Sequence, residues 1–187
     1  MEPLPLSHAF TLIETGPVVL LTTNDGQADN VMTITWTMVL GFSGRFALCT
    51  GPWNHSYAAL ETQRDCVLAI PTADMLDTVV GVGTCSGADT DKFARFGLAR
   101  APASVVKAPL LPECLANIEC RVTEVIEAEN ILILQARAAW IDRQRAERRM
   151  LHANGDGTFV ADGERFDRRE AMRAKLPPGL SGKSWTA

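Results

Sequence analysis

The second half of the chain contains two long segments that predict neighbouring strands. IECRVTEVI at 118–126 alternates between apolar and polar residues, and ILILQARAAWI follows at 131–141 after the short polar segment EAEN. Successive side chains of a strand point to opposite faces, so this alternation indicates a half-buried strand. So short a connection joins antiparallel strands, because a parallel pair needs a crossover of about a dozen residues or more. The segments therefore predict a long antiparallel hairpin.

The first half of the chain repeats this pattern with shorter strands. VVLLTT at 18–23 is followed by an Asp-Gly turn signal, and the chain returns as an extended segment at 30–38. Other short strands are predicted at 46–50, 66–70 and 158–160. Because the strands come in hairpin-like pairs rather than in alternation with helices, their order favours an antiparallel barrel over a doubly wound parallel sheet.

Short helices are predicted between these strands. The first has Ser56 as its N-cap and ends near Arg64, and the second is MLDTVVGVG, capped by Asp74. The third lies within 88–97 and ends at Gly97, and the fourth is the charged segment RQRAERRML that follows the long hairpin. All are brief insertions into a strand-rich chain, so the predicted class is mainly β (α+β).

The composition fits one globular domain. The chain has 187 residues, of which 47% are hydrophobic and 21% charged, and its net charge is −4. This charge predicts neither a nucleic acid nor an anionic membrane as a partner, and no apolar run approaches the roughly 20 residues of a membrane span. The first residues lack the pattern of a secretory signal, so we expect a cytoplasmic protein. We expect one domain over residues 1–175 and a loosely held tail at 176–187.

The cysteines and histidines predict neither a disulfide framework nor a metal centre. The five cysteines are odd in number, scattered and without a C-x-x-C pair, and most lie in apolar segments, so we expect buried free thiols. His8, His55 and His152 are far apart in the sequence, which argues against a histidine-rich metal site.

Three motifs admit both a structural and a functional interpretation. GVGTCSG at 81–87 has serine at position 86, where a dinucleotide-binding loop needs its third glycine, so it predicts a flexible loop with glycines at the end of a helix. His55 and Ser56 are adjacent and point apart, which argues against a nucleophile–base pair; Ser56 is a helix cap or, alternatively, a phosphate ligand. The arginines within 143–149 form a solvated face or, alternatively, a docking patch for a phosphorylated cofactor or an acidic partner.

The segment NVMTITWTM at 30–38 has one apolar row and one row of hydroxyls. The apolar row consists of Met32, Ile34, Trp36 and Met38. The other row carries Thr33, Thr35 and Thr37, with Asn30 at its start. Neighbours on one face of a strand lie about 6–7 Å apart, so the threonines form a ladder that suits a planar polar heterocycle or a polyol phosphate. Cross-strand pairing by threonines, which have high β propensity, explains the ladder equally well.

Seven segments, taken in order, resemble the flavin reductase-like family with an FMN-binding split barrel, and in particular its flavoredoxin branch. They are VVLLTT, NVMTITWTM, GPWNHSY, CVLAIP, CSGADTDKF, APLLPECLANIEC and LHANGDGTF, and they span about residues 16–165. The resemblance implies an antiparallel split β-barrel with short helical insertions. It also implies a homodimer that binds FMN non-covalently near the subunit interface.

The resemblance also implies which residues hold the cofactor. These are Asn30, Thr33, Trp36, Thr37, Met38, Ser56, Lys92, Trp140 and Phe159. Asn30 would meet the edge of the isoalloxazine ring, and residues 36–38 would hold the ribityl-phosphate arm. Ser56 and Lys92 would contact the phosphate or the ring edge, and a cation there would stabilise the reduced anionic flavin. Trp140 stands where many relatives have a histidine, and Phe159 is preferred to Phe166 as the late aromatic contact.

The expected function is that of an FMN-dependent oxidoreductase. One version takes hydride from NADH or NADPH and passes it to flavin or another acceptor. The other version, a flavoredoxin, carries electrons between redox protein partners, and no recognisable nicotinamide-binding motif distinguishes the two. The non-catalytic alternative is a split-barrel module that binds flavin or haem. Haem is disfavoured because the three histidines lie outside the strands expected to line the site.

Overall fold

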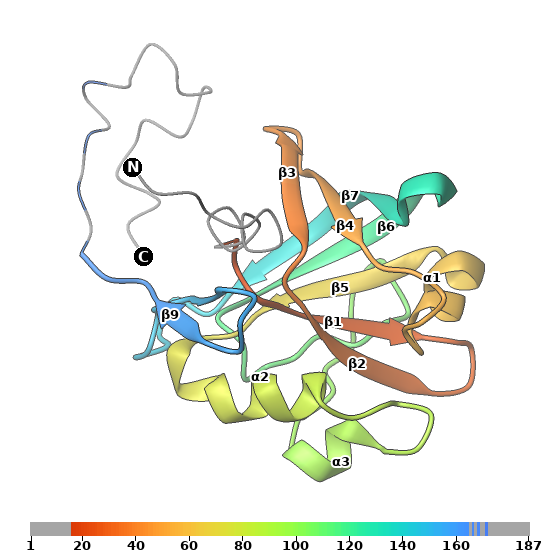
Figure 1. Cartoon of the computed structure of the whole chain (residues 1–187), viewed down its shortest axis with the longest axis horizontal. Coiled ribbons are helices and arrows are strands. Elements are labelled where there is room, and N and C mark those ends of the chain that lie inside the picture. The colour runs from red at the N-terminus through yellow and green to blue at the C-terminus, as the bar shows by residue number, and fades with distance from the viewer. Residues whose placement is uncertain (1–15, 165, 167, 169–170, 172–187) are drawn as a thin grey trace, which may run out of the picture.

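The centre of the molecule is one strongly curved antiparallel sheet (Figure 1). The computed structural model describes residues 16–164, 166, 168 and 171, and within them seven strands pair in the order β2-β1-β5-β6-β7-β4-β3. The strands are β1 (Val19–Asn24), β2 (Asp29–Ile34), β3 (Thr37–Gly41), β4 (Arg45–Cys49), β5 (Asp65–Ile70), β6 (Ala116–Ile126) and β7 (Ile131–Ile141). A separate two-stranded sheet consists of β8 (Leu151–Ala153) and β9 (Phe159–Ala161). The predicted mainly β class and the hairpins are confirmed.

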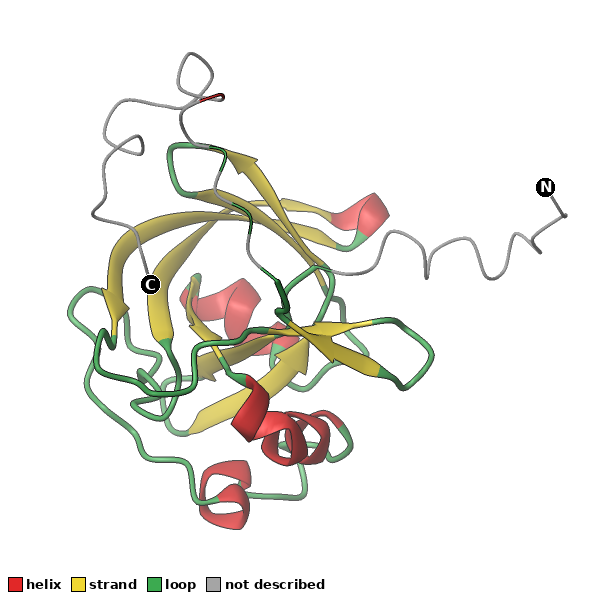
Figure 2. Cartoon of the chain, turned by 90° about the vertical axis from the view of Figure 1, so that its left-hand side faces the viewer, coloured by secondary structure: helices red, strands yellow, loops and turns green. Residues whose placement is uncertain are grey.

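The chain connection between β2 and β3 forces the sheet to close into a barrel. These strands are the two edges of the sheet, yet only Thr35 and Trp36 separate them in the sequence. Seven flat strands would place the edges about 29 Å apart, whereas the link from Ile34 to Thr37 reaches about 11 Å at most. The sheet therefore curls until the end of β2 reaches the start of β3 (Figure 2). The Cys49 amide donates to the Trp36 carbonyl at 3.0 Å, which continues the pairing of β4 with β3.

The predicted continuous strand at 30–38 is thus wrong, because it is interrupted at the crossing point. Met32 and Ile34, which precede the crossing, are buried as the alternation predicted. Trp36 and Met38, which come at and after it, are 55% and 58% exposed. The apolar row continues in the sequence but changes from the inside of the barrel to its surface, because the chain passes from one sheet edge to the other.

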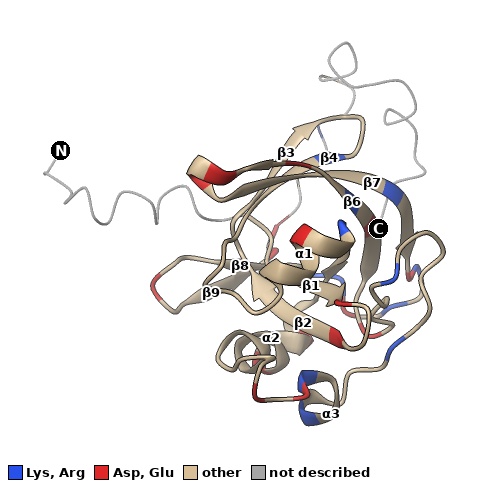
Figure 3. Cartoon of the chain, turned by 90° about the vertical axis from the view of Figure 1, so that its right-hand side faces the viewer, with Lys and Arg blue, Asp and Glu red and all other residues tan. Residues whose placement is uncertain are grey.

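Two apolar clusters lie on the two sides of β1. The cluster inside the barrel takes side chains from six strands and from α1 (Tyr57–Gln63), which lies at one end of the strands (Figure 1) and covers that end of the ring (Figure 3). The outer cluster lies between the sheet and two helices, α2 (Leu76–Gly83) and α3 (Lys92–Phe96). Leu20 of β1 belongs to the outer cluster and Leu21 to the inner one. β1 is therefore buried on both faces, and α2 and α3 are held against the strands that border the site.

The helix predictions are confirmed in part. Ser56 is the N-cap residue of α1 and Gly97 ends α3 with φ +65°, a conformation that favours glycine. Asp74 does not cap α2; it lies inside the 3-10 turn Ala73–Met75, accepts from the Thr72 hydroxyl and pairs with Arg145. A second 3-10 turn, Glu127–Glu129, joins β6 to β7.

The predicted helix at 143–151 is wrong. This segment contains turns and irregular backbone, and β8 begins at Leu151. Two of its arginines bond to residues outside the segment. Arg145 forms an ion pair with Asp74, and Arg148 donates to the Asp142 carbonyl at 3.0 Å. These contacts form in an extended connection and do not depend on a helix.

The cysteines are free thiols, as expected. Cys66, Cys114 and Cys120 are buried, and Cys49 and Cys85 are partly buried. Burial raises the pKa of the Cys114 thiol to about 12, so this group stays neutral at any physiological pH. Among the described residues, no helix has the length and hydropathy needed to cross a membrane. The predicted tail at 176–187 and His8 lie outside the described residues.

Candidate functional site

Three of the predicted cofactor residues meet in one cavity beside β2. Asn30 comes from β2, Ser56 from the turn before α1, and Lys92 from the start of α3. The cavity has a volume of about 260 Å³, and Met32 and Trp53 provide apolar wall. The sequence separates these residues by up to 62 positions, and the packing of α2 and α3 against β2 brings them together.

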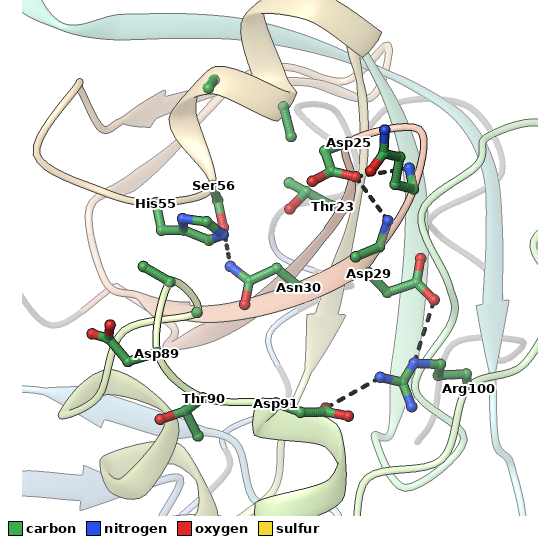
Figure 4. Close-up of a pocket in the computed structure, with 16 residues that line it drawn as sticks. Thr23, Asp25, Asp29, Asn30, His55, Ser56, Asp89, Thr90, Asp91 and Arg100 are labelled. Atoms are coloured by element: carbon green, nitrogen blue, oxygen red, sulfur yellow. Dashed lines mark hydrogen bonds and ion pairs between the residues drawn. The ribbon is translucent and has the colours of Figure 1, made fainter.

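Asn30 and Ser56 form the polar wall of this cavity (Figure 4). The Asn30 side-chain amide donates to the Ser56 hydroxyl oxygen at 2.8 Å, and Ser56 is 1% exposed. Because the Ser56 oxygen accepts this bond, its own proton remains able to donate to a bound group. Ser56 therefore lines the cavity. Although it stands at the N-cap position of α1, its side chain forms no capping hydrogen bond with this helix.

Lys92 places a cation in the cavity wall without a carboxylate beside it. The side chain is almost wholly buried, and its ammonium group donates to the Val82 carbonyl at 2.9 Å. Burial lowers the pKa of Lys92, and the Cys85 thiol acts in the opposite direction. In the part of the chain that the structure describes, Lys92 has no salt bridge. A buried charge is costly unless it is paired, so Lys92 is the residue of this cavity that is suited to hold an anionic group.

Gly87 presses the loop at 83–87 against the polar wall. A Cβ atom at Gly87 would lie 2.2 Å from the Asn30 side-chain oxygen and 2.8 Å from Cδ2 of His55. Only glycine allows this approach, because real Cβ atoms do not come so close to their neighbours. Gly87 and Trp53 lie in the CSGADTDKF and GPWNHSY segments, so both motifs contained a signal that was not assigned to the site.

His55 also lines the cavity, although its sequence position lay outside the strands expected to form the site. It precedes Ser56 in the turn before α1, and its ring lies near Asn30 (Figure 4). A prediction based on strands alone missed it, because a turn residue has no periodicity that reveals where its side chain points.

Thr33 contacts α2 and does not line the cavity. Its hydroxyl donates to the Val79 carbonyl at 2.6 Å, so this threonine ties the sheet to the helix. The cofactor role predicted for Thr33 stays a prediction. The bond does explain one threonine of the ladder by packing between elements, which neither cross-strand pairing nor ligand binding had suggested.

The remaining predicted residues lie on other parts of the barrel surface. Trp36 stands at the crossing between β2 and β3, and Thr37 and Met38 begin β3. Phe159 belongs to β9 and packs against the outer apolar cluster. None of these lines the cavity around Lys92, and Trp140 of β7 does not line it either. Their roles toward a cofactor stay predictions.

Trp140 is held by a buried carboxylate. Its indole N–H donates to Glu119 at 2.7 Å, and the same carboxylate accepts from the backbone and hydroxyl of Ser104 and from the Val105 amide. Glu119 has no exposed surface. Burial raises the pKa of Glu119, but donation from Ser104, Trp140 and Val105 outweighs burial and keeps this pKa below its usual value. The carboxylate therefore stays charged and fixes the indole ring.

A second, larger cavity of about 650 Å³ adjoins the first. Both are lined by Asn30, His55, Ser56 and Gly87, so these residues form a shared wall. The second cavity extends toward the β1–β2 turn and the segment before α3, and it is rich in aspartate (Figure 4). We refer to it as the acidic chamber, and its full lining is Thr23, Asp25, Gln27, Ala28, Asp29, Asn30, His55, Ser56, Ala58, Ala59, Gly87, Ala88, Asp89, Thr90, Asp91 and Arg100.

Comparison with known proteins identifies the family. The flavin reductase-like domain family matches residues 13–160, which is most of the chain. The chain is also 32% identical over 180 residues to the uncharacterized protein YddH of Escherichia coli K12, with 87% of this chain and 95% of that protein covered. The protein belongs to the flavin reductase-like domain family. A match of 34% identity to an uncharacterized protein of Archaeoglobus fulgidus covers 52% of this chain and 56% of that relative.

Solved structures confirm the split-barrel fold. The flavoredoxin of Desulfovibrio vulgaris (Miyazaki F) superimposes with a TM-score of 0.76 at 21% identity, covering 82% of this chain and 90% of that one. The FMN-binding domain of a flavin reductase-like enzyme from Shewanella baltica OS155 gives a TM-score of 0.76 at 25% identity, covering 88% and 95%. The fold predicted from the ordered motifs is therefore correct.

Proposed function

We propose that this protein is an FMN-dependent oxidoreductase that holds FMN non-covalently in the cavity around Lys92. The observation that carries the proposal is the buried Lys92 ammonium, which has no carboxylate partner among the described residues. FMN carries a phosphate and becomes an anion at its ring when reduced, so it offers the charge that this site requires. Solved proteins of the same fold are described as a flavoredoxin and as an FMN-binding domain, which supports this choice.

The chain's own groups suit a ligand with polar and planar parts. Lys92 would supply charge, Ser56 a hydroxyl proton, and Asn30 an amide that is already oriented by Ser56. Met32 and Trp53 would supply apolar contact. When bound, FMN would contribute one- and two-electron redox chemistry, and the protein would position it and set the charge around it.

The proposal is tested by titrating FMN into the purified chain and following flavin fluorescence. We expect Lys92→Met to weaken FMN binding by about tenfold or more, because a charge-assisted hydrogen bond contributes about 1.5–3 kcal/mol. We expect Asn30→Ala to weaken it by about fivefold, because a hydrogen bond between neutral groups contributes about 1 kcal/mol. Lys107→Met is the matched control, since it removes an exposed lysine whose ammonium group donates to Gln63, away from the cavity. A chain that takes up no FMN, or two site variants with unchanged affinity, would contradict the proposal.

The electron donor is part of the proposal and has its own test. We propose that NADH, NADPH or a redox protein supplies electrons to the bound FMN. Anaerobic titration with each nicotinamide separates these cases, because direct reduction bleaches the flavin absorbance. Bleaching by NADH or NADPH identifies a reductase, whereas no bleaching, with full reduction by dithionite, identifies an electron carrier of the flavoredoxin type.

We also propose that two copies associate through β3. This strand is an edge of the sheet, and its exposed apolar side chains include Met38, Val39 and Leu40, with Phe42 in the turn that follows. Apolar patches of this kind are typical of protein interfaces, and an uncovered edge strand offers unpaired backbone groups. Such a dimer would bring Trp36–Met38 near a partner.

A further inference from the structure

Trp53 is an exposed aromatic residue at the edge of the polar cavity. It is 64% exposed, yet it lines the same cavity as the buried residues Ser56 and Lys92. Single exposed apolar side chains are common on protein surfaces, so exposure by itself implies no function. Two further observations distinguish Trp53: the backbone around it holds its ring in one place, and it lines the cavity around Lys92 but not the acidic chamber.

A tight turn fixes the backbone of Trp53. The Asn54 amide donates to the Gly51 carbonyl at 3.0 Å, which closes a β-turn with Pro52 and Trp53 as its central residues. Proline restricts the backbone at the first of these two positions, where it is favoured. The Asn54 side chain also donates to the Thr50 hydroxyl at 3.0 Å, so the turn is joined to the residue that follows β4.

Gly51 allows the indole ring to lie against the backbone of this turn. A Cβ atom at Gly51 would lie 2.3 Å from Cζ3 and 2.5 Å from Cη2 of Trp53, and 2.8 Å from Oδ1 of Asn130. Real Cβ atoms do not come so close to their neighbours, so the ring can occupy this place only beside a glycine. The indole is thus packed on one side, while its large exposed fraction leaves ring surface for a ligand.

The cavity around Lys92 is small for a whole flavin nucleotide. Its volume of about 260 Å³ lies below the range of about 300–1,000 Å³ that small-molecule sites occupy. FMN combines a tricyclic ring, a ribityl chain and a phosphate, so part of it would lie outside the cavity. The phosphate is charged in both redox states, which makes it the part best matched to the buried Lys92 ammonium and the Ser56 hydroxyl. The ring is then the part that lies at the mouth.

The acidic chamber is a less favourable place for that ring than the surface of Trp53. The flavin ring takes up negative charge on reduction, and carboxylates would repel it. An indole carries no charge, and stacked aromatic rings attract each other beyond the effect of the area they bury. The charged residues that line the chamber are Asp25, Asp29, Asp89, Asp91 and Arg100.

We propose that the flavin ring of FMN stacks on Trp53 while the phosphate lies at Lys92, and that Gly51 positions the indole for this contact. This inference rests on the proposed function, because it assumes that FMN occupies the cavity around Lys92. It makes Trp53 a specificity-determining residue: the preferred ligand combines a planar aromatic ring with an anionic group.

FMN and riboflavin together test the proposal, because they share the ring and only FMN has the phosphate. We expect Trp53→Ala to weaken the binding of both flavins by about tenfold in equilibrium dialysis, a typical effect of removing an aromatic stacking partner. Trp53→Phe keeps a ring and should restore most of the affinity. Lys92→Met should weaken the binding of FMN and leave that of riboflavin unchanged. Val160→Ala, which truncates an exposed side chain on β9, is the control.

Two outcomes of this comparison would overturn the proposal. One is unchanged affinity of Trp53→Ala for both flavins. The other is a loss confined to FMN, because a residue that stacks on the shared ring must affect both ligands.

A double-mutant cycle tests the role of Gly51. We expect Gly51→Ala to weaken FMN binding by about fivefold or more, since the added methyl group displaces the indole. In the Trp53→Ala background the same change should have no further effect, because it acts through the ring that is already absent. Gly41→Ala is the control, since a Cβ there meets nothing within 4 Å. Additive losses would show that Gly51 acts through another neighbour and would overturn its positioning role.

Flavin fluorescence gives a readout that a purely structural role would not change. An electron-rich indole stacked on a flavin quenches its emission. We therefore expect FMN bound to Trp53→Ala, measured at saturation, to be several-fold brighter than FMN bound to the natural chain. Equal brightness would contradict stacking. If the natural chain binds no FMN, the proposed function is wrong before Trp53 is tested; if it binds FMN and Trp53→Ala binds both flavins equally well, only this inference fails.

Discussion

Gly87 illustrates how a residue without a functional group shapes the site. Its missing side chain lets the loop at 83–87 approach Asn30, and Asn30 in turn contacts Ser56. The residue acts by positioning, since it has no group that could bind a ligand through a side chain. In the sequence it belongs to the CSGADTDKF segment, which drew attention to Lys92 instead.

We expect Gly87→Ala to weaken FMN binding by about tenfold. The added methyl group would overlap the Asn30 side-chain oxygen, and relieving such an overlap costs about 1–3 kcal/mol and displaces the amide from Ser56. Flavin fluorescence titration measures the affinity, and thermal unfolding measures any general loss of stability. Gly163→Ala is the control, because a Cβ there meets nothing within 4 Å. Unchanged affinity in Gly87→Ala would show that Asn30 does not contribute to binding.

Thr33 connects two elements, and its substitution separates a structural role from a ligand role. Its hydroxyl donates to the Val79 carbonyl of α2, which packs against β2. Thr33→Val removes the donor while keeping the shape of the side chain. We expect it to lower the free energy of unfolding by about 1 kcal/mol, and to leave the affinity of the folded protein for FMN unchanged. Denaturant unfolding and fluorescence titration measure the two quantities, and a loss of FMN affinity without a loss of stability would support the cofactor role predicted from the sequence.

The pairing of β6 with β7 places Glu119 where it joins three elements. Its carboxylate binds Trp140 of β7 and the loop at Ser104 and Val105. The loop and the strand thus share one buried anion, and each donor is needed to keep that anion satisfied. The long hairpin predicted from the sequence therefore has a second function, which is to fix the loop before it.

Glu119 should make stability depend on pH in the acid range. Its pKa is lower in the folded protein than in the unfolded chain, so its contribution is fully present above the unfolded pKa and is lost as the pH falls through the folded pKa. We expect Glu119→Gln to be less stable than the natural chain at pH 7, and the difference to become smaller toward acid pH. Urea unfolding at several pH values checks this. A difference that stays constant down to pH 3 would contradict the assignment.

At the scale of the whole molecule, closure of the barrel determines which residues face outward. The crossing at Thr35 and Trp36 turns the apolar side chains of β3 to the surface, and this creates the patch proposed as a dimer interface. The same crossing leaves β2 between the inner cluster and α2, where Asn30 can reach Ser56. One connection thus separates the proposed interface from the cavity.

We expect Val39→Lys to shift the protein from dimer to monomer. A lysine at the centre of an apolar interface must be desolvated, which costs several kcal/mol unless a partner pairs with it. Light scattering during gel filtration measures the mass in solution. Val80→Lys is the control, since this exposed valine lies on α2 and not on β3. A natural chain that is a monomer when saturated with FMN would contradict the proposed dimer.

Sequence reasoning worked where the signal is local. Alternation predicted the β6–β7 hairpin, the Asp-Gly turn predicted the hairpin of β1 and β2, and glycine predicted the end of α3. It failed where one pattern admits two structures. The arginine-rich segment after β7 has the composition of a helix, yet it is not helical, and Arg145 forms an ion pair with Asp74 of a distant turn. Local propensity is a weak preference that such contacts override.

By itself, the sequence determined the class of fold, most of the strands and, through the order of its motifs, the family and three residues of the cavity. Only the tertiary structure decided that 30–38 breaks at the crossing, that Thr33 bonds to α2, and that Gly87 and His55 share a wall with Asn30. The physical reason is the range of the interactions. A strand is encoded by neighbours two positions apart, whereas a cavity depends on contacts such as Asn30 with Ser56, which arise only when a closed barrel and its helices pack together.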